Sequence, residues 1–221
     1  MQFEAPSGYP LGTNKTFKVA SKILIPLLKL LTKRDWRGVN NIPKSGPVIV
    51  ISNHISYADA LVFAHYLFAN GRAVRYLGKD SVFKIPIIGR IIASSGQIPV
   101  ARESDKASHA LDSALGLLKV GHCVGVYPEG TLTRDENLWP MVAKTGIARL
   151  AIISKAPVIP VAQWGAQAVL PAYSKKFRIF PRKKLQVKAG APLDFSKWYG
   201  MEGDSAAMVE ATEYAMAAIT S

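Results

Sequence analysis

The stretch Ile51-Ser52-Asn53-His54-Ile55-Ser56-Tyr57-Ala58-Asp59 joins a short apolar run to a helical pattern. The run, residues 47–51, has the length and composition of a buried strand. Apolar residues then recur at helical spacing over residues 61–68, and Asn70-Gly71 is a stop signal. A strand that leads directly into a helix is typical of βαβ units, so this stretch favours an α/β protein.

His54 and Asp59 lie at this strand-to-helix junction. α/β proteins commonly place chemistry there, outside the carboxyl end of a strand. A neutral imidazole can take a proton from a hydroxyl when a carboxylate receives its other ring N–H and fixes its orientation. The spacing therefore favours His54 as a general base oriented by Asp59, with the substrate's own hydroxyl as the nucleophile.

A structural role is the alternative for both residues. Ser56 and Asp59 fit a capping box, in which two side chains bind backbone N–H groups of the first helical turn. His54 could likewise be a partly buried histidine with a satisfied hydrogen bond. The spacing alone does not separate these interpretations.

The remaining patterns predict one α/β domain, which 221 residues with 49% hydrophobic content are enough to fill. Helical patterns cover residues 104–118 and 205–219, and another helix opens near Lys144. Residues 83–92 favour a short or broken helix that either docks on a membrane, covers an acyl chain or packs on the sheet. The alternation predicts a largely parallel or mixed sheet flanked by helices. Further strands are predicted at residues 73–77, 97–101, 123–127 and 157–162.

Polar residues follow several of these predicted strands, namely Lys79, Arg102 and the segment Glu129-Gly130-Thr131. Carboxyl ends of parallel strands meet at one edge of a sheet, so we expect these residues near His54. Gly130 permits a positive φ, its N–H could face an oxyanion or a phosphate, and Glu129 could hold a substrate hydroxyl. A turn residue or a surface charge is the alternative for each.

The formal net charge of +13 favours an anionic partner. Nucleic acid is disfavoured, because the positive charge lies on one helical stripe and one segment, residues 175–188, without the motifs of known readers. That segment is either a solvated face or a contact with anionic lipid. The single cysteine, Cys123, excludes an intramolecular disulfide and is compatible with a reducing compartment.

The N-terminal region, residues 15–34, has the pattern of an amphipathic helix whose lysines share one face. It is too interrupted by charge to span a bilayer, and Pro26 is expected to kink or split it. Trp36 beside it favours contact with lipid headgroups. We therefore expect residues 1–35 to form a membrane anchor and residues 36–221 the main domain. A helix packed on its own domain, with lysines in water, is the alternative.

With these residues in place, the chain resembles the glycerol-phosphate acyltransferase family, and within it the 1-acylglycerol-3-phosphate acyltransferases. The resemblance spans roughly residues 36–165. Four family blocks occur in order: Asn53-His54-Ile55-Ser56-Tyr57-Ala58-Asp59, Gly96-Gln97-Ile98-Pro99-Val100-Ala101-Arg102, Tyr127-Pro128-Glu129-Gly130-Thr131 and Val158-Ile159-Pro160-Val161.

The resemblance implies that His54 deprotonates a glycerol hydroxyl and that Asp59 orients it. The hydroxyl would attack a fatty-acyl thioester of CoA or acyl carrier protein, giving phosphatidic acid without a metal, a further cofactor or an acyl-enzyme. The implied partners are an anionic membrane surface and a lysophospholipid acceptor, at the cytoplasmic face of the cell membrane. The implied acceptor and phosphate residues are Lys79, Arg102, Glu129, Gly130, Thr131 and Arg134.

One position departs from the family pattern. Many members continue the third block with an arginine, whereas Leu132 stands there in this chain and Arg134 follows two residues later. This leaves open which arginine binds phosphate and which acceptor is used. Glycerol 3-phosphate or a glycolipid hydroxyl is an alternative acceptor, and a non-catalytic basic membrane-binding protein is an alternative of another class.

Overall fold

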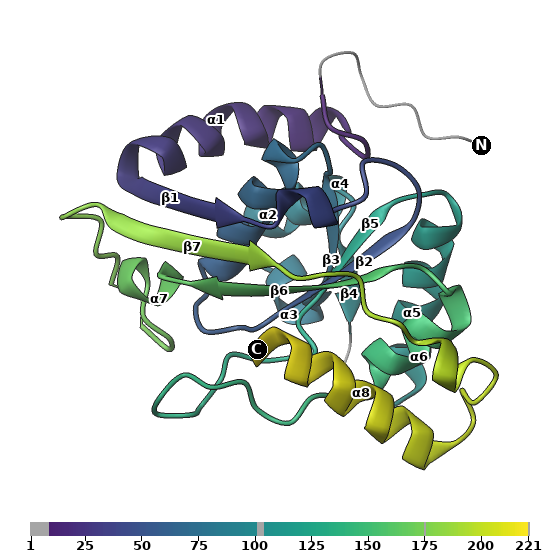
Figure 1. Ribbon diagram of the computed structural model, residues 1–221. Coiled ribbons are helices and arrows are strands. Elements are labelled where there is room, and N and C mark those ends of the chain that lie inside the picture. Colours follow the sequence, from purple (N-terminus) through teal and green to yellow (C-terminus); the bar gives the residue numbers. More distant parts are fainter. Residues whose placement is uncertain (1–8, 101–103, 175, 221) are drawn as a thin grey trace.

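A mixed sheet of seven strands runs through the computed structural model, which describes residues 9–100, 104–174 and 176–220 (Figure 1). The strand order is β1-β7-β6-β2-β5-β3-β4. Strands β2 to β6 are mutually parallel, β7 runs antiparallel to β6, and β1 pairs parallel with β7. The strands are β1 (Thr32–Arg37), β2 (Val48–Ser52), β3 (Val74–Lys79), β4 (Ile98–Val100), β5 (Cys123–Val126), β6 (Val158–Trp164) and β7 (Lys183–Ala189).

Helices cover both faces of this sheet, which confirms the predicted α/β class. Residues of α5, α6 and α8 form one apolar core with the sheet, and residues of α2 form a second core on the other face. Figure 1 shows α1 and α8 on opposite sides of the sheet. The helices are α1 (Lys15–Leu31), α2 (Asp59–Ala69), α3 (Asp80–Phe83), α4 (Ile88–Ser94), α5 (Ser104–Lys119), α6 (Gly146–Ser154), α7 (Ala166–Val169) and α8 (Ser205–Thr220), with 3-10 turns at Val39–Asn41 and Ser196–Trp198.

Strand β2, predicted from its apolar run, is the central element. It pairs with β5 on one side and β6 on the other, and all five of its residues are buried. Ile49 and Ile51 belong to the core on the α8 side, while Val48 and Val50 belong to the core on the α2 side. A strand covered on both faces has a continuous rather than alternating apolar pattern, as this one does.

The edge strand β1 and its neighbour β7 were not predicted. Helix α1 ends at Leu31, and the next residue begins β1, so a division of the chain after residue 35 falls inside a strand. Strand β7 overlaps the C-terminal part of the basic segment 175–188 and ends one residue beyond it; its residues Leu185, Val187 and Ala189 are buried and alternate with exposed residues. Polar side chains, two of them lysines, occupy the exposed positions, so the segment was interpreted from its charge and its period of two was missed.

Two residues of the N-terminal region differ from expectation. Of the two effects expected of Pro26, a split of α1 does not occur, because Pro26 lies inside one uninterrupted helix. Trp36 is half-buried and packs edge-on against His65 and Tyr66 of α2, with ring centroids 4.8 and 5.6 Å away. Trp36 therefore contacts the domain itself instead of pointing toward a headgroup layer.

Helix α1 joins β1 through a tightly bonded junction. The Thr32 Oγ1 donates a hydrogen bond of 2.6 Å to the carbonyl of Leu28. The Arg182 guanidinium, which precedes β7, donates to the carbonyls of Lys29 and Thr32, each at 2.8 Å. These bonds satisfy carbonyls at the helix C-terminus, which otherwise lack partners.

The segment 83–92 runs from the last residue of α3 through a sharp turn into α4, which agrees with the predicted short or broken helix. Ile87 has a φ of 65°, and the N–H of Ile88 donates to the carbonyl of Pro86 at 2.7 Å, which closes a γ-turn. Ile85, Ile87, Ile88 and Ile91 are between 43% and 72% exposed, so packing on the sheet is the wrong interpretation for this turn. None of the helices in the described part of the chain is long and apolar enough to cross a bilayer.

His65 of α2 is buried beneath α1 and lowers the stability of the fold in acid. Burial, together with the positive charges of Arg34 and Lys29, lowers its pKa from 6.5 to about 4. The unfolded chain therefore binds a proton near pH 6.5, whereas the folded chain does not until near pH 4. Because the unfolded state binds more protons in this window, stability falls as the pH falls through it.

Replacing His65 with Gln is expected to make the free energy of unfolding less dependent on pH between 6.5 and 4, because one neutral buried imidazole no longer resists protonation. Urea unfolding at pH 7.5, 6.0 and 4.5 measures this. The control is His109→Gln, at an exposed histidine of α5. An equal slope of stability against pH in both variants would contradict the assignment.

Candidate active site

The strands β2, β5 and β3 are adjacent and parallel, so their carboxyl ends share one edge of the sheet. The segment Asn53–Asp59 follows β2, residues 127–131 follow β5, and Lys79 ends β3. The backbone N–H of His54 donates to Glu129 Oε1 at 3.1 Å, which joins the first two segments directly. The predicted gathering of polar residues at this edge is thus observed for His54, Asp59 and Glu129.

His54 and Asp59 form the predicted pair. The Nδ1 atom of His54 lies 3.0 Å from Asp59 Oδ2. The imidazole is 18% exposed, whereas the carboxylate is fully buried. A carboxylate accepting the Nδ1 proton leaves the lone pair of the ring on Nε2, the nitrogen that can accept a proton from a substrate.

Asp59 also shapes the backbone around the histidine. The same Oδ2 atom accepts hydrogen bonds from the N–H groups of Ile55 and Ser56, at 2.6 and 2.7 Å. Burial raises the pKa of Asp59, and these hydrogen bonds and His54 oppose that rise. Oδ1 is buried and has no hydrogen-bond partner among the described residues.

The capping-box alternative is half realised. Asp59 accepts the N–H of Ser56, as a capping box requires. Ser56 Oγ, however, donates to the carbonyl of Leu170 at 2.6 Å and accepts the N–H of Ala58 at 3.0 Å. It thus fixes the junction to the end of α7. Asp59 therefore contacts both the backbone of the junction and the imidazole of His54.

An aromatic stack supports the imidazole of His54. The Tyr127 ring lies parallel to it, with centroids 4.1 Å apart and planes within 19°. Tyr76 stacks on Tyr127 in turn, at 5.8 Å. Gly125 of β5 is paired with Tyr76 on the adjacent strand β3. The absence of a side chain at Gly125 makes room for the stack, because a Cβ there would lie 2.6 Å from the Tyr76 ring. The stack and Asp59 together fix the plane and the edge of the imidazole.

Glu129 has a structural role that was not predicted. Its Oε1 accepts the N–H of His54, and its Oε2 accepts the N–H of Met141 at 2.9 Å. Only 4% of the residue is exposed, and burial raises its pKa while the two N–H groups oppose that rise. Each oxygen therefore accepts one backbone N–H, and Glu129 clamps the 131–143 loop to His54.

Gly130 adopts the predicted positive φ, at 68°, but its N–H does not face the site. It donates to the carbonyl of Tyr127 at 2.9 Å and closes a turn. The expected oxyanion role of this N–H is therefore wrong. Because glycine has no side chain, the Lys144 side chain can pack beside position 130; its Nζ would lie 3.7 Å from a Cβ placed there. Lys144 places an exposed ammonium group beside the turn.

The other predicted residues are dispersed around this edge. Lys79 and Arg134 are exposed, and Thr131 is half-buried beside the clamp. Leu132, which stands at the arginine position of the family pattern, is buried, and its carbonyl accepts a hydrogen bond from Tyr173. Arg102 lies outside the described residues.

Three residues of the site were missed by sequence reasoning. Tyr127 was noted only as part of a motif, and Lys144 only as the start of a helix. Gln163 bonds to Asn53 through backbone and side chain and lies 3.4 Å from the Tyr127 hydroxyl. Their roles depend on neighbours that are distant in the sequence, so only knowledge of which residues lie close together in space would have identified them. Among the described residues, no group of three or more His, Cys, Asp or Glu is arranged to hold a metal ion.

Comparison with known proteins places this geometry in context. Residues 33–164 match a family model described as Acyltransferase. A chloroplastic 1-acyl-sn-glycerol-3-phosphate acyltransferase of Brassica napus is 30% identical over 145 residues, which cover 65% of this chain and 40% of that protein. The 1-acyl-sn-glycerol-3-phosphate acyltransferase of Bacillus subtilis is 28% identical over 177 residues, which cover 80% and 82%.

A solved structure is also similar. The crystal structure of the 1-acyl-sn-glycerophosphate acyltransferase of Thermotoga maritima superposes with a TM-score of 0.68 and 25% sequence identity. The match covers 89% of this chain and 74% of that one. The similarity therefore extends over almost the entire α/β domain. By contrast, the chain spans less than half the length of the Brassica napus relative.

Glu129→Ala is expected to lower the free energy of unfolding by about 2–4 kcal/mol, because two buried N–H groups lose their acceptor. Urea unfolding measures the loss, and hydrogen exchange should accelerate at the amides of His54 and Met141. Glu136→Ala, at an exposed acid of the same loop, is the control. Wild-type stability and exchange in Glu129→Ala would show that the clamp does not hold the loop.

Proposed function

Because the chain belongs to the Acyltransferase family, we propose that it transfers a fatty-acyl group from a thioester to the free hydroxyl of 1-acylglycerol 3-phosphate, giving phosphatidic acid. The 3.0 Å contact between His54 and Asp59, at the edge where three parallel strands end, carries this proposal. The names of the Brassica, Bacillus and Thermotoga relatives support the choice of acceptor.

In the first step, His54 Nε2 accepts the proton of the acceptor hydroxyl as its oxygen attacks the thioester carbonyl carbon. The imidazolium that forms keeps its Nδ1–H on Asp59, whose negative charge stabilises it. The Tyr127 ring stacked on the imidazole prevents it from tilting away from the hydroxyl. Correct orientation before reaction reduces the entropic part of the barrier.

In the second step, the tetrahedral intermediate collapses and the carbon–sulfur bond breaks. The thiolate leaves and accepts the proton that His54 carries, which returns the imidazole to its neutral form. The products are the ester and a free thiol, so atoms and charge balance without an acyl-enzyme. Asp59 keeps the same contact throughout, because Nδ1 stays protonated in both states.

Exposed cations around the edge supply the charge that the acceptor phosphate needs. Lys144 beside Gly130, Lys79 at the end of β3 and Arg134 in the 131–143 loop are the described residues we assign to this role. Lysine acts on phosphate as a point charge, whereas arginine can form two parallel hydrogen bonds. Leu132 is buried, whereas Arg134 in the loop and Lys144 directly after it are exposed, so we assign the phosphate contact to these two cations.

Acyl transfer by purified protein tests the reaction and the acceptor together. An oleoyl thioester would be offered with lysophosphatidic acid, glycerol 3-phosphate, a glycolipid or a neutral lysolipid, and products identified by mass. Phosphatidic acid as the main product supports the proposal. Selective acylation of another acceptor would reassign the substrate, and no transfer by folded protein would favour a non-catalytic membrane-binding role.

His54→Ala and Asp59→Asn are expected to lower kcat by about 10²–10⁴-fold, the usual contribution of a positioned general base. The asparagine can still accept the N–H groups of Ile55 and Ser56 through its oxygen, so the fold should persist. Circular dichroism and vesicle binding serve as controls for each variant. Wild-type turnover in Asp59→Asn would reduce Asp59 to a purely structural residue.

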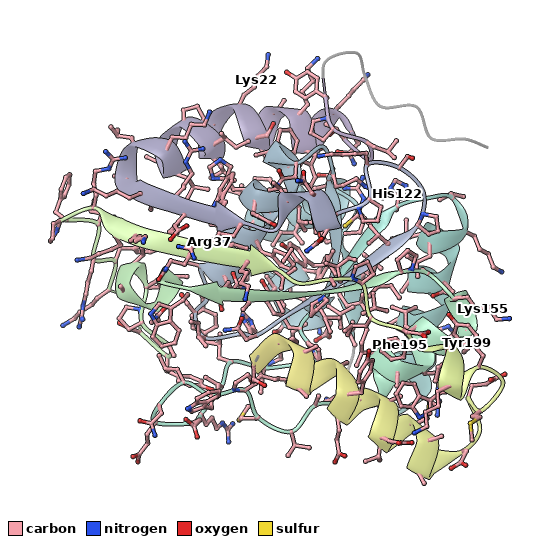
Figure 2. The ribbon with its side chains drawn as sticks, in the orientation of Figure 1. Lys22, Arg37, His122, Lys155, Phe195 and Tyr199 are labelled. Carbon is pink, nitrogen blue, oxygen red and sulfur yellow. The ribbon has the colours of Figure 1, made fainter. Side chains whose placement is uncertain are left out.

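We also propose that α1 attaches the protein to an anionic membrane surface. The apolar residues of α1 that point away from the domain are between 46% and 69% exposed. The lysines of α1 form a stripe beside these residues, and Lys22 extends outward from the helix (Figure 2). These lysines are Lys15, Lys18, Lys22 and Lys29. An apolar stripe next to a basic one suits a helix lying in the interface. The exposed residues are Val19, Ile23, Leu27 and Leu30.

The α3–α4 turn supports the same assignment. The side-chain amide of Asn14, which caps α1, donates to the carbonyl of Ser94 at the end of α4. Arg75 of β3 also ties the carbonyls of Gly12 and Ser95 together. The exposed isoleucines of the turn therefore belong to the same rigid body as α1.

The double variant Ile23→Glu with Leu30→Glu is expected to weaken sedimentation with anionic vesicles at least about tenfold, because two carboxylates would enter the interface. Its turnover with a water-soluble, short-chain lysophosphatidic acid should be unchanged. Val209→Glu on α8, at a similarly exposed apolar residue across the sheet, is the control. Equal vesicle binding by the two proteins would remove α1 from the contact.

A further inference from the structure

A groove of about 380 Å³ lies beside the His54 site, within the roughly 300–1,000 Å³ range of ligand pockets. It runs over the ends of β6, β7 and β1 and is bordered by residues 138–140 and by the end of α8. Leu185 of β7 points into the core on the α2 side, so Gln186 and Lys188 lie in reach of this groove.

The lining combines aromatic faces, cations and amides. Trp139 and Trp164 are 58% and 48% exposed, which is high for the largest aromatic side chain. Arg37, labelled in Figure 2, and Lys188 supply positive charge, and Gln186 supplies an amide. A ligand that would use all three kinds of group carries a planar heterocycle for the aromatic faces, phosphates for the cations and peptide-like groups for the amides.

The charge of the groove is positive despite one acid in its lining. Asp35 bonds to the Arg37 guanidinium at two points of 3.0 Å and to Lys184 Nζ at 2.9 Å. Those bonds hold the pKa of Asp35 well below its usual range. Arg37 and Lys184 together carry one more positive charge than is needed to balance Asp35. That charge and the charge of Lys188 remain for an anionic ligand.

The groove is connected to His54 through one loop. The hydroxyl of Thr133 donates to the carbonyl of Trp139 at 2.6 Å, and the N–H of Thr133 donates to the carbonyl of His54 at 2.8 Å. Glu129 links the N–H of His54 to that of Met141 in the same loop. The loop that carries Trp139 is thus hydrogen-bonded to the backbone carbonyl of His54 through Thr133 and to its backbone N–H through Glu129.

We propose that this groove binds the nucleotide end of a CoA thioester, with the adenine against the tryptophan faces and the phosphates on Arg37 and Lys188. The pantetheine arm would run toward His54 past Asn53 and Gln163, which also line the groove. This inference rests on the proposed acyl transfer, and it selects CoA over acyl carrier protein as the donor for which the site is built.

Binding of CoA is measured first, by calorimetry or tryptophan fluorescence, without reference to turnover. Lys188→Glu should weaken CoA binding at least about tenfold, which is a common effect of reversing one charge next to a phosphate. Lys183→Glu is the matched control, because it makes the same charge change on the same strand outside the groove. Pantetheine, which lacks the nucleotide, should bind both variants equally.

The aromatic part of the site is tested by a pair of variants at one position. Trp164→Ala should weaken CoA binding, whereas Trp164→Phe, which keeps an aromatic face, should restore most of it. Failure of wild-type protein to bind CoA, or equal affinities for Lys188→Glu and Lys183→Glu, would overturn the proposal.

Kinetics separates the inference from the proposed function. In Lys188→Glu the KM for acyl-CoA should rise about tenfold at unchanged kcat, whereas the KM for an acyl thioester of N-acetylcysteamine, which lacks the nucleotide, should not change. An equal rise for both donors would overturn the subsite. CoA binding without transfer to any acceptor would instead refute the function and leave the subsite standing.

Discussion

Three donors converge on one buried carboxylate oxygen, Asp59 Oδ2, and the arrangement of the active edge depends on it. The atom accepts the backbone N–H groups of Ile55 and Ser56 as well as the ring proton of His54. One residue therefore sets both the path of the chain and the orientation of the base. A hydrogen bond to an ionised group in low dielectric is stronger than a neutral one, so the geometry is held firmly.

A second buried carboxylate, Glu129, extends this constraint to the loop that follows β5. It contacts backbone only, and its two oxygens set the distance between His54 and Met141. Conversely, the groups we assign to the phosphate are exposed cations such as Lys144. The site therefore separates a buried, hydrogen-bonded interior, which orients the imidazole, from an exposed basic rim.

The sequence predicted those parts of the molecule that local patterns encode. Strand β2 and helix α2 followed from an apolar run and a helical period, and the parallel sheet placed His54, Asp59 and Glu129 at one edge. The edge strand β1 and its neighbour β7 were missed because they pair with each other across the length of the chain, which no local pattern records. Trp36 was misjudged for the same reason, since its contacts come from α2.

The roles of individual site residues were harder to predict than their location. A glutamate in a turn can bind a substrate or a backbone amide, and only the position of Met141 decides between them. The Gly130 N–H was assigned to an oxyanion because the turn that consumes it cannot be seen in the residue type. Tyr127 and Lys144 gain meaning only from the neighbours that the fold gives them.

The direct junction between α1 and β1 has a consequence for how far the protein can reach. Thr32 and Arg182 lock the last turn of the helix to the sheet, so no flexible tether separates the two. If α1 attaches to a bilayer as we propose, this junction sets the height and tilt above the lipid of the sheet edge that carries His54. Such a protein cannot sample the solution for an acceptor, and it must wait for one to diffuse laterally beneath it. Its rate should then follow the surface density of the lipid acceptor in two dimensions, independent of the total volume.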